Sequence, residues 1–559
     1  MAWAVDNFVP ILFLGLFVFL LSGFPVAFVL CAVGLLFGMF GIILGLFPVE
    51  MLQAVPLRII GIMQNDTILA VPYFTFMGIV LQKSGIAEDL LETTGQVFGP
   101  LRGGLAISVI VVGALLAATT GVISAAVISM GLISLPVMLR YGYSRHVATG
   151  VIMASGSLAQ IIPPSVILIV LADQLGRSVG DMFLGAMIPG LCLVGIYVLF
   201  VVAVAVARPS WVPAMPVEAR TYREASGSSG YRSLSVLFTV ATIAGFAAWL
   251  SGELFTQMNL GTRGMSVDIV ISVVTGAATA IALIGIDRLF HFGWFSTLAV
   301  RVTLLLLPPL VLIFLVLGTV FLGLATPTEG GAMGAIGALV LAAIRRRLDA
   351  VVLRGAVEHT ARLTCFVIFI LIGASVFSLV FNAADGHTFV EGLFEHLPGG
   401  EVGFLVAVNT LVFFLGFFLD FFEIAFIVIP ILAPIAEGMG IDLIWFGVLI
   451  AVNLQTSYLT PPFGFALFFL RNVAPRQDYV DRVTGARISR ISTEQIYRGA
   501  VAFVVLQLVM IAILIIRPGL VTDQLGVRST IDPTSVIIKI EPETYPDADD
   551  DPMRGFRVE

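Results

Sequence analysis

The sequence predicts an all-α membrane protein that crosses the bilayer many times and contains two inverted repeats. Of its 559 residues, 59% are hydrophobic and only 12% are charged, and the mean hydropathy is +1.06. Apolar runs of about 18 residues or more, long enough to span a bilayer, recur along the whole length. This composition excludes a soluble globular protein, in which about a quarter of the residues are charged. No basic run with interleaved aromatic residues occurs, so nucleic acid is not an expected partner.

An apolar block occurs twice and ends each time in a Pro-Pro pair. The first copy ends in QIIPPS and the second in YLTPPF, so the offset from Pro163 to Pro461 is 461 − 163 = 298 residues. The same offset places Pro136 on Pro434 without a gap. Repeats that contain interrupted apolar segments are typical of secondary transporters, whose binding site lies between the repeats.

The distribution of Lys and Arg, which concentrate in cytoplasmic loops, gives the two copies opposite orientations. In the first copy, Lys83 and Arg140 flank the segment 103–139. The corresponding flanks of the second copy, residues 382–401 and 437–442, contain neither Lys nor Arg. We therefore expect one re-entrant hairpin to open to the cytoplasm and the other to the periplasm. The whole chain is expected to make about twelve crossings besides the two hairpins, with both termini periplasmic.

These patterns divide the chain into seven segments. They are 1–82 (N-terminal scaffold spans), 83–207 (first repeat, with a hairpin at 103–139 and a broken helix at 145–176), 208–300 (an insertion with a basic cytoplasmic loop and two extra spans), 301–380 (scaffold spans with the motif TPTE), 381–497 (second repeat, with a hairpin at 402–437 and a broken helix at 443–471), 498–516 (last span) and 517–559 (an acidic, solvated tail). Amphipathic stretches at 86–98 and 383–397 occupy matching repeat positions and are candidate arms between a scaffold and a moving part.

A proline pair in mid-membrane frees backbone N–H and C=O groups, which then need partners other than lipid. Freed carbonyls can coordinate a sodium ion, and half-helix N-termini can face an anionic substrate. Small and polar residues surround both breaks. The candidate binding residues are Ser155, Gly156, Ser157, Gln160 and Pro163 in the first repeat, and Asn453, Gln455, Thr456, Thr460, Pro461, Pro462 and Gly464 in the second. The alternative at each break is a proline kink that Ser and Thr side chains satisfy.

Two acidic residues, Asp420 and Glu423, lie near the expected tip of the second hairpin. Acids within the membrane are usually functional and paired. The alternative is a shallow tip at which both acids contact water. In the motif ATPTEGG, Thr326 and Thr328 could cap the helix that follows, and Glu329 joins two spans.

Five blocks of the sequence carry a family resemblance: LSGFPVAFVL, KSGIAEDLLE, GYSRHVATGVIMASGSLAQIIPPS, ATPTEGGAMGAIGAL and NLQTSYLTPPFGFALFFL. Together they resemble the large, DctM-like membrane subunit of TRAP (tripartite ATP-independent periplasmic) transporters, and most of all the branch labelled mannitol/chloroaromatic. The likeness covers most of residues 9–516. It implies an elevator-type importer in the bacterial inner membrane, surrounded by lipid. It also implies a periplasmic binding protein that delivers a small organic acid, and a separate small four-helix membrane subunit.

The same resemblance implies sodium as the coupling ion, with no other cofactor. One sodium site would form between Thr119, Thr120 and Gly121 at the first hairpin tip and Ser155–Pro163 at the first break. The other would form between Gly416–Asp420 and Asn453–Pro462, with the substrate between the two tips.

Two alternatives stay open at this point. Proton coupling through Asp420 fits the sequence, and so does a stand-alone sodium- or proton-coupled carboxylate carrier that needs no binding protein. An enzyme is not expected, because no HExxH motif, no membrane-face DDxxD motif and no nucleophile–base pair occurs.

Overall fold

The computed structural model describes residues 2–120, 123–220, 230–257, 265–395, 397–481 and 483–525. In these residues the regular structure is helical apart from one two-stranded antiparallel ribbon. Nine of the described helices are long and apolar enough to span a membrane, or up to eleven if each of two bent pairs counts as one span. The all-α, multi-pass prediction is thereby confirmed, and the number of about twelve crossings stays a prediction.

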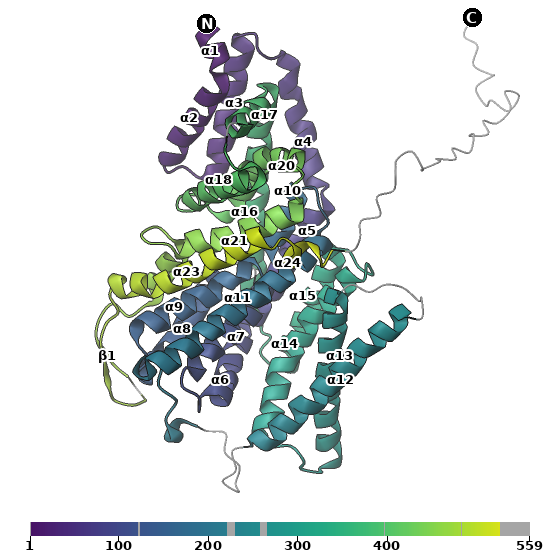
Figure 1. Ribbon diagram of the computed structural model, residues 1–559, viewed down its shortest axis with the longest axis vertical. Helices are drawn as coiled ribbons and strands as arrows, with labels where there is room; N and C mark the ends of the chain where they lie inside the picture. The colour runs from purple at the N-terminus through teal and green to yellow at the C-terminus, as the bar shows by residue number, and fades with distance from the viewer. Residues whose placement is uncertain are drawn as a thin grey trace, which may run out of the picture.

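Most of the helices before the first repeat stand at the end of the molecule that carries the N-terminus, and the last of them reaches its middle (Figure 1). They are α1 (Ala2–Asp6), α2 (Phe8–Leu21), α3 (Val26–Ile43), the 3-10 turn η1 (Val49–Gln53), α4 (Ala54–Met63) and α5 (Asp66–Lys83). Glycine lets α3 approach a later helix closely, because a methyl group added at Gly34 would lie 2.9 Å from the side chain of Val376.

The two repeats follow the same order of elements. The first contains α6 (Ile86–Phe98), α7 (Gly104–Thr120), α8 (Ile123–Arg140), α9 (Arg145–Ser157), η2 (Leu158–Gln160), α10 (Val166–Gln174) and α11 (Val179–Ala207). The second contains α17 (Gly386–Glu395), α18 (Gly400–Leu415), α19 (Phe421–Ile427), α20 (Ile429–Gly438), α21 (Leu443–Leu459), α22 (Phe465–Val473), β1 (Tyr479–Val480), β2 (Arg487–Ile488) and α23 (Thr493–Ile516), followed by α24 (Gly519–Thr522).

The helix limits agree with the offset of 298. Adding 298 to the limits of α8, 123 and 140, gives 421 and 438, which are the limits of α19 and α20 taken together. Adding 298 to 145, where α9 begins, gives 443, where α21 begins. The repeats differ at one point. The chain bends by 52° between α19 and α20, whereas the corresponding segment of the first repeat is the single helix α8. Pro430, just after the bend, cannot donate the hydrogen bond of a continuous helix.

Helices α12 to α16 and two short turns connect the repeats. They are η3 (Pro209–Trp211), η4 (Val217–Ala219), α12 (Tyr231–Gln257), α13 (Met265–Phe290), α14 (Thr297–Phe321), α15 (Pro327–Ile344) and α16 (Ala350–Ala383). Figure 1 shows α12 and α13 beside α14 at one side of the molecule. At the start of α15, the Thr326 hydroxyl accepts a hydrogen bond from the Glu329 N–H, and the Glu329 carboxylate accepts one from the Thr326 N–H. The predicted cap by Thr326 is therefore present.

Residues 208–220 form a strap across the base of the first hairpin. Three backbone hydrogen bonds hold it there. They run from Gly103 N to Val212 O (2.9 Å), from Ser144 N to Trp211 O (2.8 Å) and from Met215 N to Gly99 O (2.8 Å). The beginning of the predicted insertion is thus part of the first repeat's packing.

Ion pairs connect the repeats at both ends. On the side predicted to be periplasmic, Arg177 Nη2 lies 2.6 Å from Glu437 Oε1, which neutralises an otherwise unexpected cation there. On the side predicted to be cytoplasmic, the Arg140 guanidinium at the end of α8 donates three hydrogen bonds of 3.0–3.1 Å to Asp481, next to β1. Thr484 donates two more to the same carboxylate, from its N–H and its hydroxyl.

The Asp481 contacts predict a pH-dependent contribution to stability. The hydrogen bonds from Arg140 and Thr484 hold the pKa of the Asp481 carboxyl well below its usual range. A carboxyl whose folded pKa is lowered stabilises the fold fully above its unfolded pKa of about 4. This contribution decreases as the pH falls below that value and is lost only below the folded pKa. We expect Asp481→Asn to lower the melting temperature at pH 7, and its difference from the wild type to narrow steadily as the pH falls below about 4. A constant difference between the two proteins across this range would contradict the assignment.

Candidate functional site

Two proline pairs interrupt helices at matching places in the repeats. Helix α9 ends at Ser157 and the chain resumes as α10 at Val166, whereas α21 ends at Leu459 and resumes as α22 at Phe465. The peptide bond within each pair is cis. Each half-helix after a break packs on the other repeat: α10 contacts α19, α20 and α21, and α22 contacts α8 and α9. The breaks therefore lie where the repeats meet.

At the first break, Ser165 replaces part of the interrupted helix ladder. Its hydroxyl accepts a hydrogen bond from Ile167 N (3.2 Å) and lies within donating distance of the carbonyls of Ala159 (2.9 Å) and Gln160 (3.1 Å). A simple proline kink would also need a hydroxyl to form hydrogen bonds with its freed backbone groups in this way. Ser165 itself is fully buried, so the first break is closed from solvent.

The side chain of Gln160 is not satisfied in this way. Gln160 is 0% exposed, and neither its Nε2 nor its Oε1 has a hydrogen-bond partner among the described residues. A buried primary amide can make four hydrogen bonds, and leaving it without any costs free energy. An orphaned buried amide next to a break indicates a place for water, an ion or a polar ligand group.

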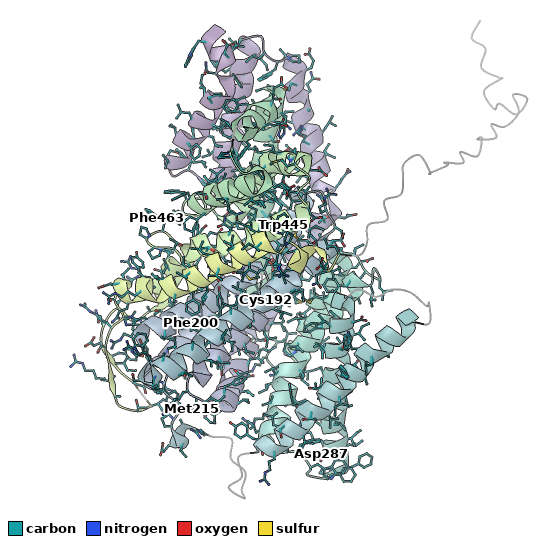
Figure 2. The ribbon with its side chains drawn as sticks, in the orientation of Figure 1. Cys192, Phe200, Met215, Asp287, Trp445 and Phe463 are labelled. Atoms are coloured by element: carbon teal, nitrogen blue, oxygen red, sulfur yellow. The ribbon has the colours of Figure 1, made fainter. Side chains whose placement is uncertain are left out.

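The second break is built differently and is open. Position 463, the counterpart of Ser165 (165 + 298), is Phe463, which is 55% exposed and projects at the edge of the molecule (Figure 2). Here the Thr460 hydroxyl donates to the carbonyl of Thr456 (2.8 Å), and Gly464 N donates to the carbonyl of Thr460 (3.1 Å). Pro462 is exposed as well. The two breaks thus share their proline pairs but not their polar caps.

The first hairpin, α7 and α8, packs directly on the first broken helix. A methyl group added at Gly113 in α7 would lie 2.5 Å from Cβ of Ser155, and one added at Gly156 would lie 2.5 Å from the Val127 side chain in α8. Helix α7 also contacts the turn η2. Its last turn holds Thr119 and Thr120, whereas Gly121 lies outside the described residues. The structure therefore brings α7 against the first broken helix, and the sodium site at its last turn stays a prediction.

The second hairpin approaches its broken helix in the same manner. A methyl group added at Gly416, just after α18, would lie 2.7 Å from Cβ of Ser457 in α21. The Asn453 side chain donates a 2.6 Å hydrogen bond to the carbonyl of Asn409 in α18. Asn453 and Ser155 are repeat counterparts (155 + 298 = 453), and both face the first arm of their own hairpin.

The two acids at the second hairpin cap a helix. Asp420 Oδ1 accepts a hydrogen bond from Glu423 N (2.9 Å), and Glu423 Oε2 accepts one from Asp420 N (2.8 Å). This reciprocal capping box begins α19, and the Asp-x-x-Glu spacing in LDFFE is its sequence signature. Glu423 is 8% exposed. Sequence reasoning selected both residues for their charge and did not recognise the cap.

A fully buried polar cluster joins the two broken helices, and half of it was not expected from the sequence. Gln507 in α23 places its Nε2 2.8 Å from the Tyr197 hydroxyl and 3.4 Å from both Ser157 Oγ and Gln455 Oε1. Ser157 and Gln455 were predicted site residues, whereas Tyr197 and Gln507 lie in α11 and α23, the helices that come after the half-helices α10 and α22. Thr456, another predicted residue, is buried and donates to the carbonyl of Val452 at 3.3 Å.

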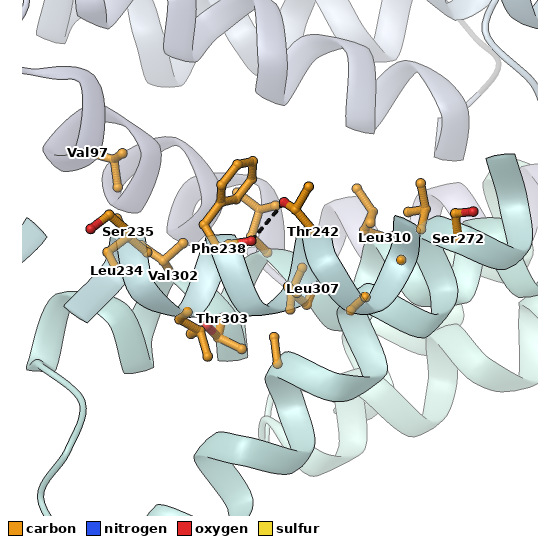
Figure 3. Close-up of a pocket in the computed structure, with 18 of the residues that line it drawn as sticks. Val97, Leu234, Ser235, Phe238, Thr242, Ser272, Val302, Thr303, Leu307 and Leu310 are labelled. Carbon is orange, nitrogen blue, oxygen red and sulfur yellow. Dashed lines mark hydrogen bonds between the residues drawn. The ribbon is translucent and has the colours of Figure 1, made fainter. Parts of the chain in front are cut away.

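A large cavity of about 950 Å³ lies away from both breaks, among α12, α13 and α14 and facing α6 and α7 (Figure 3). Its lining is almost entirely hydrocarbon, and the Thr242 hydroxyl beside it donates to the carbonyl of Phe238 in its own helix at 2.8 Å. None of the predicted site residues lines it. The hydroxyls of Thr242 and Ser272 donate within their own helices, so a polar solute would find few free hydrogen-bonding groups there, and this cavity is not the candidate site.

The arrangement of the described helices is similar to that of a solved membrane protein. The solved structure of the Alcanivorax borkumensis YdaH transporter matches the fold with a TM-score of 0.50 at 14% identity, covering 85% of this chain and 90% of that one.

A family model described as "Tripartite ATP-independent periplasmic transporter, DctM component" matches residues 13–520, and the chain belongs to this family. It is 26% identical over 424 residues to the C4-dicarboxylate TRAP transporter large permease protein DctM of Pseudomonas aeruginosa, covering 76% of this chain and 81% of the relative. The isethionate TRAP transporter permease protein DctMQ of Oleidesulfovibrio alaskensis is 23% identical over 468 residues, which cover 83% of this chain and 60% of that protein. The sialic acid TRAP transporter large permease protein SiaM of Vibrio cholerae is 24% identical over 420 residues, covering 74% and 79%.

These relatives confirm the family expected from the sequence, and they confirm that the chain is a transport protein rather than an enzyme. The mannitol/chloroaromatic branch stays a prediction.

Proposed function

We propose that this chain imports a small organic acid by sodium-coupled, elevator-type alternating access. It would receive the solute from a periplasmic binding protein and work with a separate small membrane subunit in the bacterial inner membrane, with both termini periplasmic. The family is tripartite, and the named relatives act on C4-dicarboxylates, isethionate or sialic acid, all of which are acids. Half-helix N-termini, which carry partial positive charge, suit such an anion.

The observation that carries the proposal is the paired approach of hairpin to break. Gly113 lies against Ser155 in the first repeat and Gly416 against Ser457 in the second. Because both approaches need a residue without a side chain, each hairpin is packed directly against the helix that a proline pair interrupts. Two such places in one packed body support two ion sites flanking a substrate site.

The arm α6 is tied to the part proposed as the scaffold. Asp89 in α6 pairs with Arg345 Nη1 (3.4 Å) and Arg347 Nη2 (3.1 Å), just after α15. Arg347 also donates to the carbonyls of Ser84 and Gly85 at the start of the arm. This clamp supports α6 as a fixed link past which the first hairpin moves, and α17 occupies the matching position in the second repeat.

Substitutions of Asp420 separate sodium coupling from proton coupling. Asparagine caps helices about as well as aspartate but carries no charge, whereas alanine loses the cap at a cost of about 1 kcal/mol. If sodium is the coupling ion, Asp420→Asn keeps the pH dependence of the wild type even where it needs more sodium for uptake, and Asp420→Ala weakens uptake further through the lost cap. Uptake of labelled substrate at several pH values, at fixed sodium, measures this. Loss of uptake in Asp420→Asn together with a changed pH profile would instead favour a proton route.

Reconstitution tests the whole proposal. The chain, its small subunit and its binding protein are placed in proteoliposomes with an imposed sodium gradient and a panel of labelled organic acids. Uptake is expected to need both the gradient and the binding protein. Sodium-driven uptake without the binding protein would indicate a stand-alone carrier, which the family assignment does not favour.

A further inference from the structure

We propose that Gln507, held by Tyr197, is a positioning residue that couples the two breaks, so that ion binding in one repeat alters ion binding in the other. The inference rests on the proposed function, because it concerns the two ion sites assigned there. The inference is based on one amide group, that of Gln507, which contacts equivalent positions in both repeats.

The shared positions are repeat counterparts. Ser157 and Gln455 are 455 − 157 = 298 residues apart, which is the offset of the proline pairs. Both side chains are 0% exposed, and both lie 3.4 Å from the same atom, Gln507 Nε2. Ser157 ends α9 directly before the first break, and Gln455 lies in the last turn of α21 before the second. Gln507 thus contacts each repeat at the point where its helix is about to end.

The hydrogens of Gln507 are too few for its neighbours. An amide nitrogen carries two hydrogens, but three oxygen atoms surround this one. The Tyr197 hydroxyl at 2.8 Å takes one hydrogen at a normal distance, while Ser157 and Gln455, both at 3.4 Å, are beyond the usual range. The second hydrogen is therefore shared between the two repeats, and it can bond well to only one of them at a time.

The other donors do not relieve this shortage. The Ser157 hydroxyl donates to the carbonyl of Ala154 at 2.9 Å, so towards Gln507 and Tyr197 it acts as an acceptor. In addition, Gln507 Oε1 and Gln455 Nε2 are buried without a partner among the described residues. A network that is only partly satisfied is costly and has alternative arrangements of similar energy.

The sharing gives the coupling its direction. When an ion orders the first break and Ser157 takes the shared hydrogen, Gln455 Oε1 is released. A released amide oxygen is the kind of ligand that a hard cation takes. The second ion then binds at a site already prepared by the first, which is positive cooperativity in the sense of linked equilibria.

The experiment measures the sodium dependence of uptake by the complete reconstituted complex. We expect a Hill coefficient above 1 for the wild type and about 1 for Gln507→Met, which keeps the length of the side chain but removes its hydrogens. Tyr197→Phe keeps the ring, whose centroid lies 5.2 Å from that of Phe503, and frees one hydrogen for each repeat. We expect Tyr197→Phe to uncouple the sites as well, because each repeat then has a hydrogen of Gln507 to itself and the two no longer compete.

The matched control is Trp445→Phe. Trp445 Nε1 donates a 3.0 Å hydrogen bond to the carbonyl of Leu514, so this buried bond also joins α21 to α23, but at the opposite end of α21 from the break (Figure 2 labels Trp445). Trp445→Phe should keep the Hill coefficient of the wild type. If Gln507→Met also keeps it, the proposed coupling is wrong. If the wild type itself shows no sodium dependence, the proposed sodium coupling is wrong. The hydrogen-bond link made by Gln507 is then tested by the measurement that follows.

A stability measurement without sodium tests only whether Gln507 links Ser157 to Gln455. Ser157→Ala, Gln455→Met and the double variant are each made in the wild type and in Gln507→Met. The melting temperatures of these proteins are then compared. Sites that share a partner are non-additive, and sites that do not are additive. We expect non-additive shifts in the wild type and additive shifts in Gln507→Met. Additive shifts in the wild type would overturn the inference whatever the coupling ion is.

Discussion

Replacing Gln160 with leucine is expected to abolish sodium-driven uptake while raising the melting temperature. Gln160 is fully buried with both polar atoms unpaired among the described residues, so its amide destabilises the fold by about 1–3 kcal/mol. Leucine has a similar volume and no polar atoms, and it removes that cost. If the amide serves an ion or substrate at the first break, function disappears as stability increases. Uptake in proteoliposomes and thermal unfolding of the same preparation measure the two effects.

Thr75→Val is the matched control for this prediction. The Thr75 hydroxyl in α5 is likewise fully buried and unpaired among the described residues, but it lies outside both repeats. We expect this isosteric change to stabilise the protein and to leave uptake unchanged. If Gln160→Leu behaves in the same way, Gln160 has no part in transport.

Gly464→Ala is expected to reduce uptake more than tenfold, because the second break has no room for a side chain. A methyl group at this position would lie 2.3 Å from the carbonyl oxygen of Tyr458 and 3.0 Å from that of Thr460. Both contacts are to backbone, so relief requires a shift of the break itself. A shift of this size in a site that must hold its ligands in place removes most of the rate.

The control for this change is Gly438→Ala. Gly438 ends α20 in the same repeat, and a methyl group added there has no neighbour within 4 Å. It should transport like the wild type. Normal uptake by Gly464→Ala would show that the second break tolerates displacement, and the site would then have to be placed elsewhere.

Features that depend on neighbours in the sequence could be predicted. Proline removes a helix hydrogen bond, and the matching positions of the pairs that begin at Pro163 and Pro461 locate both breaks and set the repeat offset. The pair Pro308–Pro309, which lies inside the continuous helix α14, shows that a proline pair alone would not have been enough. The cap made by Thr326 was predictable for the same reason, since a capping residue acts on its own first turn. The Asp420–Glu423 cap has an equally local signature and could have been found from it.

Features that depend on packing between distant helices could not be predicted. Gln507 lies 350 residues from Ser157 along the chain, and one glutamine within an apolar span carries no sign of its partners. The offset of 298 points from Gln507 to position 209, which is Pro209, so the repeat gives no hint either. The closure of one break and the exposure of the other also depend on which helices cover them.

The difference between Ser165 and Phe463 has an evolutionary consequence. If the two halves descend from one duplicated ancestral unit, they began with the same residue at this position. One half has come to carry a hydroxyl that closes its break, and the other an aromatic ring that projects outward. Such divergence lets the copies divide the labour, with one specialising in holding a ligand and the other in admitting or releasing it. Exchanging the two residues would then reverse roles that the copies acquired after the duplication.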